Sequence, residues 1–169
     1  SYTFAKVSPQ EAEALGKNLT PLGAEMAANN AGTIPKWTGG LTSQNTPKSK
    51  DSGRPENPFV EDKPLFEITS ANFSEYKENL SAGQIAMFEK YADYKMPIYK
   101  TRRTAAYTDE LYDVVKKNAT TSELVRSGNG LANFDTAIPF PIAKNGSEVI
   151  WNHITRYRGG SAKRFLTTI

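Results

Sequence analysis

The pattern of apolar and polar residues predicts several short helices rather than a few long ones. The first follows Ser8, which has the features of an N-cap because a proline comes next and Glu11 completes a capping box; Gly16 ends the stretch. A second short helix is predicted at residues 20–27, and a weaker helical piece at residues 72–80.

Two further helices have clearer apolar faces. Ser81 and Gln84 form a second capping-box pattern, and the apolar stripe after them is Ile85, Phe88, Tyr91 and Ala92. Asp109 and Glu110 begin the next helix, where acidic residues suit the helix dipole. Its apolar face consists of Leu111, Tyr112, Val114 and Val115.

The last predicted helix begins at Asn145 or Ser147 and runs to Tyr157, before a glycine pair that ends it. Its apolar side carries Ile150, Trp151, Ile154 and Tyr157. Its polar side carries Glu148, Asn152, Thr155 and Arg156. We expect the apolar side to pack against another part of the protein.

Residues 29–64 differ from the rest, because these 36 residues hold five of the ten prolines and four glycines. Proline interrupts helices and removes hydrogen-bond donors from strands. A loop of this length favours an arm that wraps another surface. We expect Trp37, Phe59 and Phe66 to anchor it, and residues 42–56 to be its loosest part.

Strand patterns are weak until the end of the chain. Residues 96–101 have an extended pattern, but Pro97 restricts them to an edge strand or to no strand. Residues 163–169 alternate, with Phe165, Thr167 and Ile169 on one side. Because one strand cannot form a sheet, we expect the chain to be the N-terminal part of a longer protein that contains β-structure.

Composition narrows the function. The sequence has no cysteine and one histidine, which excludes disulfides and cysteine nucleophiles and makes histidine-based metal sites and Ser–His–Asp triads improbable. No run of 18 apolar residues predicts a membrane-spanning helix. The first residue is Ser1, so we expect that any signal peptide has been removed. These features favour a binding or structural protein without a cofactor.

Charge is unevenly distributed around a net charge of +3. Residues 56–93 hold eight acids and three bases, whereas residues 94–169 hold twelve bases and six acids. The basic half could meet the phosphates of lipid, or an acidic protein surface. No block rich in lysine and arginine carries interleaved aromatic residues, so we expect no nucleic-acid partner.

Four arginines are candidate phosphate contacts, because the guanidinium fork suits bidentate recognition of phosphate. They are Arg102, Arg103, Arg156 and Arg158. The alternative is that these arginines, and Lys100, Lys163 and Arg164 beside them, form salt bridges and promote solubility.

Three other features have two interpretations each. His153 could be a proton donor or ligand contact, but we favour a packed histidine with one polar partner. Residues 127–131 are glycine-rich without matching a phosphate-binding loop, so we predict a tight turn. Residues 138–142, which include Phe140, could form a binding strip but more simply form a buried connector.

Six segments in order suggest a relationship to known proteins: LTPLGAE at 19–25, GTIPKWTGG at 32–40, KPLFEIT at 63–69, YKTRRTAA at 99–106, IPFPI at 138–142 and WNHITRYRG at 151–159. In this order, with Asn145-Gly146, the chain resembles a bacterial envelope family of unknown function. The family is often labelled outer-membrane lipoprotein-sorting protein and is common in Pseudomonas. A His-Arg pair is usual there where this chain has Arg102-Arg103.

The resemblance implies a cleaved signal peptide and a location in the periplasm or at the outer membrane. It also implies a longer protein, whose later part is a half-open antiparallel β-barrel like that of lipoprotein carriers, with a concave apolar face for acyl chains. Genes of the family tend to lie near transporters of the resistance–nodulation–division type, which are therefore expected partners. The resemblance provides no catalytic residues.

Together these observations predict an α+β fold, of which this chain is the mainly helical, loop-rich N-terminal part. The expected divisions are N-terminal helices at 1–28, the arm at 29–69, a helical segment at 70–160 and the start of the barrel at 161–169. We expect the chain to associate through the edge strand at its C-terminal end.

The expected function is that of a non-enzymatic carrier or chaperone for lipid, lipoprotein or other hydrophobic cargo. The alternative is an adaptor that binds protein partners in an envelope transport assembly. Candidate contacts with cargo or barrel are Trp151, Ile150, Ile154 and Phe140.

Overall fold

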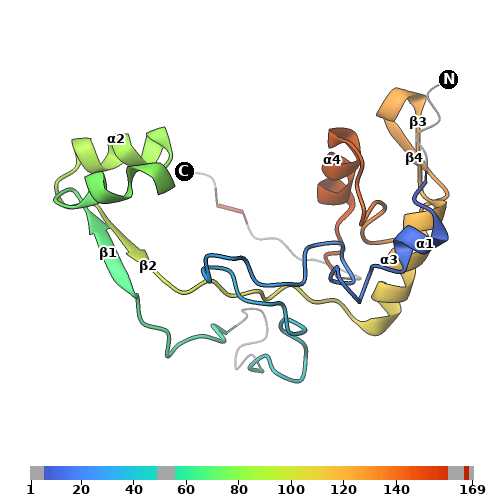
Figure 1. The fold of residues 1–169 in the computed structure, drawn as a ribbon, viewed down its shortest axis with the longest axis horizontal. Coiled ribbons are helices and arrows are strands. Elements are labelled where there is room, and N and C mark those ends of the chain that lie inside the picture. The colour runs from blue at the N-terminus through green and yellow to red at the C-terminus, as the bar shows by residue number, and fades with distance from the viewer. Residues whose placement is uncertain (1–5, 49–55, 160–165, 168–169) are drawn as a thin grey trace. The chain divides into compact units, whose positions relative to one another are not determined.

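The structure is a computed structural model that describes residues 6–48, 56–159 and 166–167. The chain divides into two compact units, which are described separately here (Figure 1). One unit consists of Ser1–Ala28, Lys36–Thr42 and Thr104–Ile169, and the other consists of Asn29–Pro35 and Ser43–Arg103. Both contain helices and antiparallel strands, so the fold is α+β, as predicted.

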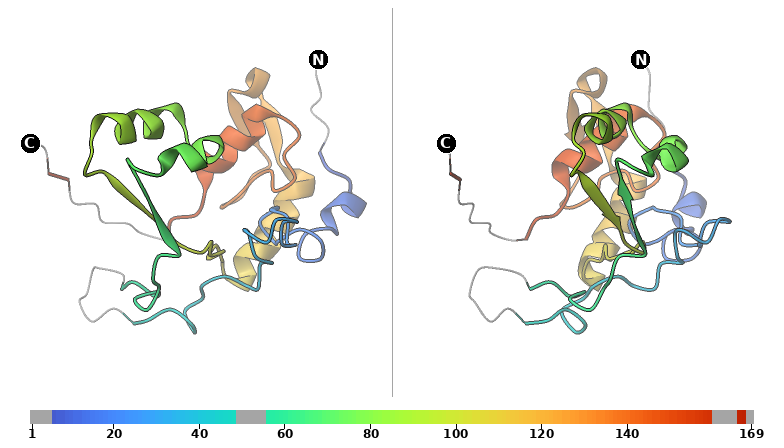
Figure 2. Two further views of the ribbon diagram at one scale, coloured as in Figure 1. Left: turned by 60° about the vertical axis from the view of Figure 1, so that its left-hand side comes forward. Right: turned by 90° about the vertical axis from the view of Figure 1, so that its left-hand side faces the viewer.

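The second unit is a two-stranded antiparallel ribbon with helices at one end (Figures 1 and 2). Strand β1 (Phe66–Thr69) pairs with β2 (Lys95–Ile98), and the register places Phe66 opposite Ile98. The 3₁₀ helix η1 (Phe73–Asn79) and the helix α2 (Ala82–Lys90) connect the two strands. The capping box predicted at Ser81 is present and begins α2, while the weaker helical piece is this 3₁₀ helix.

Aromatic side chains form the core of this unit. Phe88 of α2 is 1% exposed, and its ring lies 5.7 Å from that of Phe73 and 4.8 Å from that of Tyr94. Ile68 of β1 is also buried. Nearby, the Asn72 side chain donates to the carbonyl of Glu67 and accepts from the backbone N–H of Thr69. It therefore satisfies two backbone groups of β1.

The first unit is built on the helix α3 (Asp109–Thr121), which packs against the short helix α1 (Pro9–Ala12). The predicted capping box at Ser8 begins α1. After α3 come the hairpin of β3 (Glu123–Val125) and β4 (Gly130–Ala132), joined by η2 (Arg126–Gly128), and then the helix α4 (Gly146–Thr155). The buried apolar cluster contains Val7, Ala12, Leu15 and Ala119, with Leu19 and Ile142 packed against it.

The helix predicted at residues 20–27 is absent, and that prediction is wrong. Thr20 instead exchanges backbone hydrogen bonds with the residues after it, and its hydroxyl accepts from Ala24 N. Gly23 has φ +93°, and a Cβ on it would lie 1.7 Å from the carbonyl oxygen of Pro141. The close approach of these two segments therefore requires a glycine and a turn.

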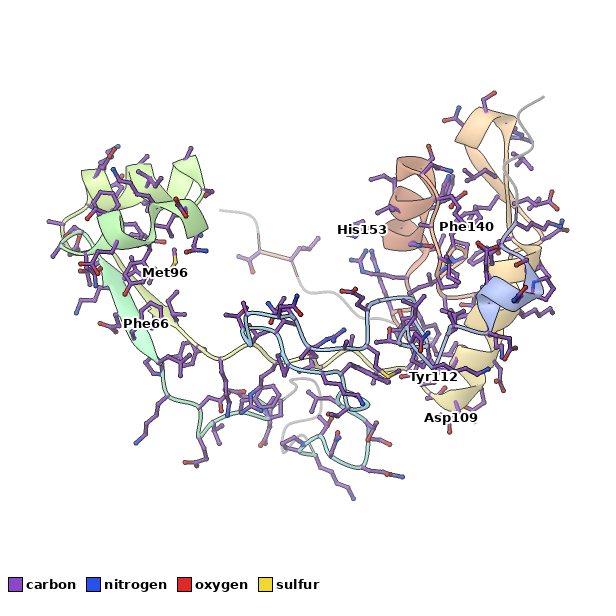
Figure 3. All side chains as sticks on the ribbon, in the orientation of Figure 1. Phe66, Met96, Asp109, Tyr112, Phe140 and His153 are labelled. Atoms are coloured by element: carbon purple, nitrogen blue, oxygen red, sulfur yellow. The ribbon has the colours of Figure 1, made fainter. Side chains whose placement is uncertain are left out.

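Residues 29–48 and 56–64 of the arm contain no helix or strand, as their prolines predicted, whereas the end of the expected arm, Phe66–Thr69, forms β1. Trp37 is anchored in the first unit, where its Nε1 donates to Ala105 O over 2.9 Å and its backbone N–H donates to Met26 O. In the second unit, Phe59 lies under the Arg102 guanidinium at 4.1 Å. Phe66 (labelled in Figure 3) stacks on Tyr76 at 5.2 Å.

Strands β1, β3 and β4 were not predicted. Residues 95–98 form β2 in a two-stranded sheet, which agrees with the edge-strand interpretation of the segment around Pro97. The segment around Phe66, expected only as an apolar anchor, pairs with a strand about 30 residues away in the sequence. The strand predicted at residues 163–169 lies outside the described residues, apart from 166 and 167, which are in no strand.

Candidate functional site

Helix α4 begins with a polar network around Glu148, which is 4% exposed. Asn145 is the N-cap: its side chain accepts from Glu148 N over 3.1 Å and donates to Glu148 Oε1 over 2.9 Å. The backbone N–H of Lys144 donates to Glu148 Oε2 over 2.6 Å. The Glu148 carboxylate therefore accepts hydrogen bonds in the interior of the first unit, from the two residues that precede α4.

One turn later, Asn152 connects α4 to the segment beneath it. Its Nδ2 donates to Phe140 O over 2.7 Å, and its Oδ1 accepts from Phe140 N over 2.9 Å. The side chain thus pairs with both backbone groups of one residue, as a neighbouring strand would. Together with Glu148, it turns the polar side of α4 inward.

The apolar side of α4 faces outward. Val149, Ile150 and Ile154 are 56%, 59% and 54% exposed, respectively. Ile150 and Ile154 are therefore exposed among the described residues, and their expected contact with cargo or with a barrel stays a prediction. The physical reason is that hydrogen bonds to buried backbone groups fix the helix by its polar side.

Trp151 is half-buried, and its Nε1 donates to Gly128 O over 2.8 Å. Gly128 belongs to the tight turn predicted at residues 127–131, which joins β3 to β4. Arg126 and Ser127 have φ values of 51° and 55° in this turn, a region that non-glycine residues rarely adopt. An open groove of about 700 Å³ lies along Trp151, Ile150, Ile154 and this turn.

Phe140, a predicted cargo contact, is buried at 9% exposure and lies beneath α4 rather than on its outer face. The interpretation of residues 138–142 as a buried connector is confirmed. Asn118 of α3 holds the residues just before them: its Nδ2 donates to Thr136 O and Ile138 O, and its Oδ1 accepts from Asp135 N.

His153 is exposed and projects from α4 (Figure 3), so the interpretation as a packed histidine is wrong. A guanidinium nitrogen of Arg156 donates to the carbonyl of His153 and lies 3.4 Å from its Nε2. Arg156 therefore contacts the last turn of α4, where a positive charge suits the helix dipole.

Arg102 is occupied by an acidic partner in the second unit. Its Nε donates to Asp62 Oδ2 over 2.7 Å, and a second guanidinium nitrogen donates to Oδ1. This hydrogen bonding, with the charges of Arg102 and Lys100, lowers the pKa of Asp62 below its usual range. The bidentate fork expected for phosphate thus binds a carboxylate of the same chain.

The other predicted cations are divided between the two units. Arg103 donates to the carbonyl of Pro35 in the second unit. Arg156 and Arg158 follow the end of α4 in the first unit. Lys163 and Arg164 lie outside the described residues. The described residues thus support the salt-bridge alternative at Arg102 and leave phosphate binding by Arg158 untested.

The comparisons with known proteins identify the family. Residues 67–169 match a family described as a protein of unknown function, DUF1329. The chain belongs to the DUF1329 family. An uncharacterized protein of Pseudomonas aeruginosa (strain PAO1) is 54% identical over 165 residues, which cover 97% of this chain and 36% of that protein. The chain thus spans about a third of the length of this relative. No solved structure matches the chain.

Membership in the DUF1329 family confirms the predicted resemblance to a Pseudomonas-type family of unknown function. Within residues 6–48, 56–159 and 166–167, no helix is long and apolar enough to cross a membrane. The same ranges contain no group of three histidine, aspartate or glutamate side chains placed to hold a metal ion.

Sequence reasoning missed the inward polar side of α4, although one signal for it was present. Asn145 and Glu148 have the spacing of an N-cap and the third residue of its helix. At this spacing the glutamate side chain can fold back toward the start of the helix. No comparable local signal indicates that Asn152 binds the backbone of Phe140, twelve residues earlier.

Proposed function

We propose that this DUF1329 protein is a non-enzymatic carrier or chaperone for lipid, lipoprotein or other hydrophobic cargo in the periplasm, at the outer membrane. The observation that supports this proposal is the outward apolar face of α4, formed by Val149, Ile150 and Ile154. A polar network holds the helix in this orientation, so the face is available to a binding partner.

Burial of these side chains would give useful binding energy. Covering a fully exposed aliphatic side chain contributes roughly 1.5–3 kcal/mol, so a half-exposed one contributes about half of that. Contributions of this size from three side chains support association but are reduced by ordering costs. The face is therefore one contact region within a larger binding surface.

The proposal gives the rest of the protein a role. The P. aeruginosa relative has about two thirds of its length outside the matched region. We propose that this part supplies the half-open antiparallel barrel of a lipoprotein carrier, with α4 beside its apolar concave face. A transporter of the resistance–nodulation–division type is the proposed partner that delivers or receives the cargo.

An adaptor in an envelope transport assembly is the second candidate, and a separate observation favours it. Val60 and Leu65 of the arm are 72% and 66% exposed in the second unit. Exposed apolar side chains on a proline-rich segment suit a protein partner, since an extended segment can place its side chains in the pockets of a partner and form backbone hydrogen bonds with it.

Native mass spectrometry of the full-length protein purified from its own periplasm tests these candidates. A carrier co-purifies with lipid, and the double variant I150S/I154S loses most of it. The matched control V60S/L65S removes the same number of exposed apolar side chains from the arm and keeps the lipid. Stoichiometric protein partners that are lost only with V60S/L65S support the adaptor. Full-length protein without lipid contradicts the carrier.

A further inference from the structure

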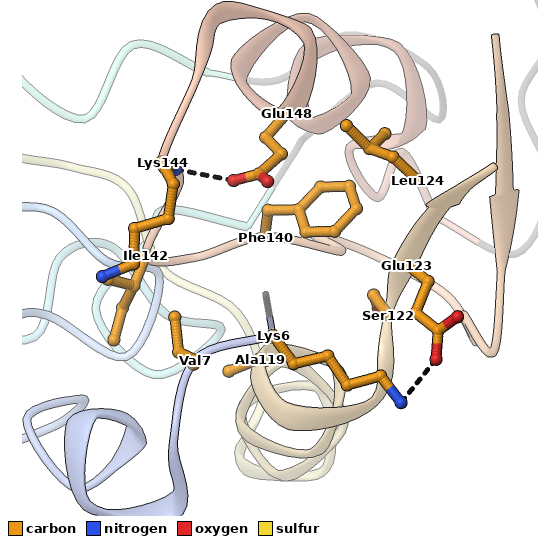
Figure 4. A pocket seen from close by; sticks show the side chains of 10 residues that line it. All are labelled: Lys6, Val7, Ala119, Ser122, Glu123, Leu124, Phe140, Ile142, Lys144 and Glu148. Carbon is orange, nitrogen blue, oxygen red and sulfur yellow. Dashed lines mark hydrogen bonds and ion pairs between the residues drawn. The ribbon is translucent and has the colours of Figure 1, made fainter. Parts of the chain in front are cut away.

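A small cavity lies beneath α4, where three segments of the first unit meet (Figure 4). The segment before α1 contributes Val7, the end of α3 contributes Ala119 and Ser122, and the chain leading into α4 contributes Ile142. Beside it, Lys6 of the first segment forms an ion pair with Glu123 of β3. The cavity is separate from the outward face of α4, because Glu148, which lines it, is on the opposite, buried side of that helix.

The hydroxyl of Ser122 is the unusual feature of this cavity. Ser122 is 2% exposed, and its Oγ has no hydrogen-bond partner among the protein groups that the structure describes. Its backbone N–H is satisfied, since it donates to Asn118 O over 2.9 Å. A buried hydroxyl without a partner is unfavourable, and such groups in folded proteins commonly bind an internal water molecule.

The size of the cavity determines what can occupy it. Its volume is about 10 Å³. A site must offer at least about 10–15 Å³ by this measure to hold one water molecule, so the cavity is at the lower limit for a single water. An acyl chain or any other organic ligand is too large, which makes this site independent of the proposed cargo.

Glu148 provides a second polar group on the cavity wall. Each of its carboxylate oxygens accepts one hydrogen bond, from Lys144 N and from Asn145 Nδ2. An ionised carboxylate has about four acceptor positions, so capacity for a further donor remains. Ser122 can donate to a water, and the water can donate to this carboxylate.

We infer that the cavity binds one internal water molecule, which accepts a hydrogen bond from Ser122 Oγ and donates one to the Glu148 carboxylate. The water links the end of α3 to the buried side of α4. It thereby adds a third connection to those that Lys144 and Asn152 make beneath this helix.

A high-resolution crystal structure of the intact protein tests the inference directly. The expected result is one ordered water within hydrogen-bond distance of Ser122 Oγ and of a Glu148 carboxylate oxygen. In S122V the two methyl groups occupy this space, and the water is lost. A wild-type structure in which Ser122 donates to a protein group such as Asn118 O, or in which the cavity holds no water, overturns the inference.

Water–amide cross-relaxation measured by NMR on the intact protein gives a second test in solution. The backbone amide of Glu123 should show a cross-peak to a long-lived water, which weakens in S122A and disappears in S122V. The matched control is T121V, which removes a hydroxyl that already donates to Lys117 O in the same turn of α3. An unchanged cross-peak in S122V, or equal loss in T121V, contradicts a water bound at Ser122.

Discussion

Asn118 shows how much of this fold depends on single polar side chains. It is 1% exposed and makes three hydrogen bonds to the backbone of residues 135–138. These bonds hold a loop in which Ala137 has φ 69° and is fully buried. A non-glycine residue persists in this left-handed conformation only where its surroundings enforce it.

We therefore expect N118A to lower the free energy of unfolding by about 2–4 kcal/mol, because it leaves buried backbone groups without partners. Urea denaturation of the intact protein measures the change. The control K117A alters the exposed neighbouring side chain and should stay within about 0.5 kcal/mol of the wild type. Equal effects of the two variants would show that Asn118 does not hold the loop.

Acid sensitivity is also set by individual residues. The pKa of Glu11 is lowered to about 2, chiefly by the hydrogen bond from Lys144 and then by the capping-box bonds with Ser8. The pKa of Glu13 is also lowered to about 2, by hydrogen bonds from Lys116 and Lys17. A lowered folded-state pKa means that the stabilising contribution is present above the unfolded pKa and is lost as the pH falls through the folded pKa.

The melting temperature should therefore fall between pH 4.5 and pH 2, and E11Q should reduce this dependence. Glutamine keeps an oxygen that can accept from Ser8 N but has no charge for Lys144. A matched control, E89Q, removes an exposed carboxylate of α2 that forms no ion pair with the described residues, and it should affect the profile less than E11Q does. High salt should flatten the wild-type profile, because these pairs are at the surface. A profile identical in wild type and E11Q would contradict this account.

At the scale of elements, the sequence reveals the starts of helices better than it reveals which strands pair. The starts of α1 and α2 were predicted from Ser8 and Ser81, because a capping box is complete within four residues. Strand β1 was missed because its partner lies about 30 residues away, and four residues carry little pattern by themselves.

The orientation of α4 also depends on contacts that the local sequence pattern does not reveal. Its position and its two sides were predicted, and the apolar side was expected to pack against another part of the protein. The partners that fix the orientation of the helix are backbone groups of Lys144 and Phe140, and any residue presents such groups. Amphipathic spacing therefore identified the candidate face, while its exposure depends on tertiary hydrogen bonds.

Because the polar side of α4 faces inward, we expect a substitution on that side to destabilise the protein more than one on the apolar side. N152L should destabilise residues 1–169 by roughly 2–3 kcal/mol, because it leaves the N–H and carbonyl of Phe140 unsatisfied although leucine has a similar size. I150S should change stability by no more than about 0.5 kcal/mol, because that side chain is exposed. Denaturant unfolding of both variants provides the comparison. A larger loss for I150S would show that the apolar side faces inward.

At the scale of the whole molecule, the described units account for only part of the relative's length, since the chain spans 36% of it. The outward face of α4 and the proposed edge strand at residues 163–169 would both be covered by other parts of the carrier. An exposed apolar face and an unpaired strand promote association. The central claim is thus that residues 1–169 provide a binding face but not a complete cargo site.

Sedimentation velocity of residues 1–169 with a fluorescent fatty acid, with and without the rest of the protein added in trans, tests this claim most directly. The account predicts that the isolated chain binds no fatty acid as a monomer, and that it self-associates or binds the added remainder. I150S/I154S should weaken that association. A stable monomer that binds the fatty acid stoichiometrically by itself would contradict the account.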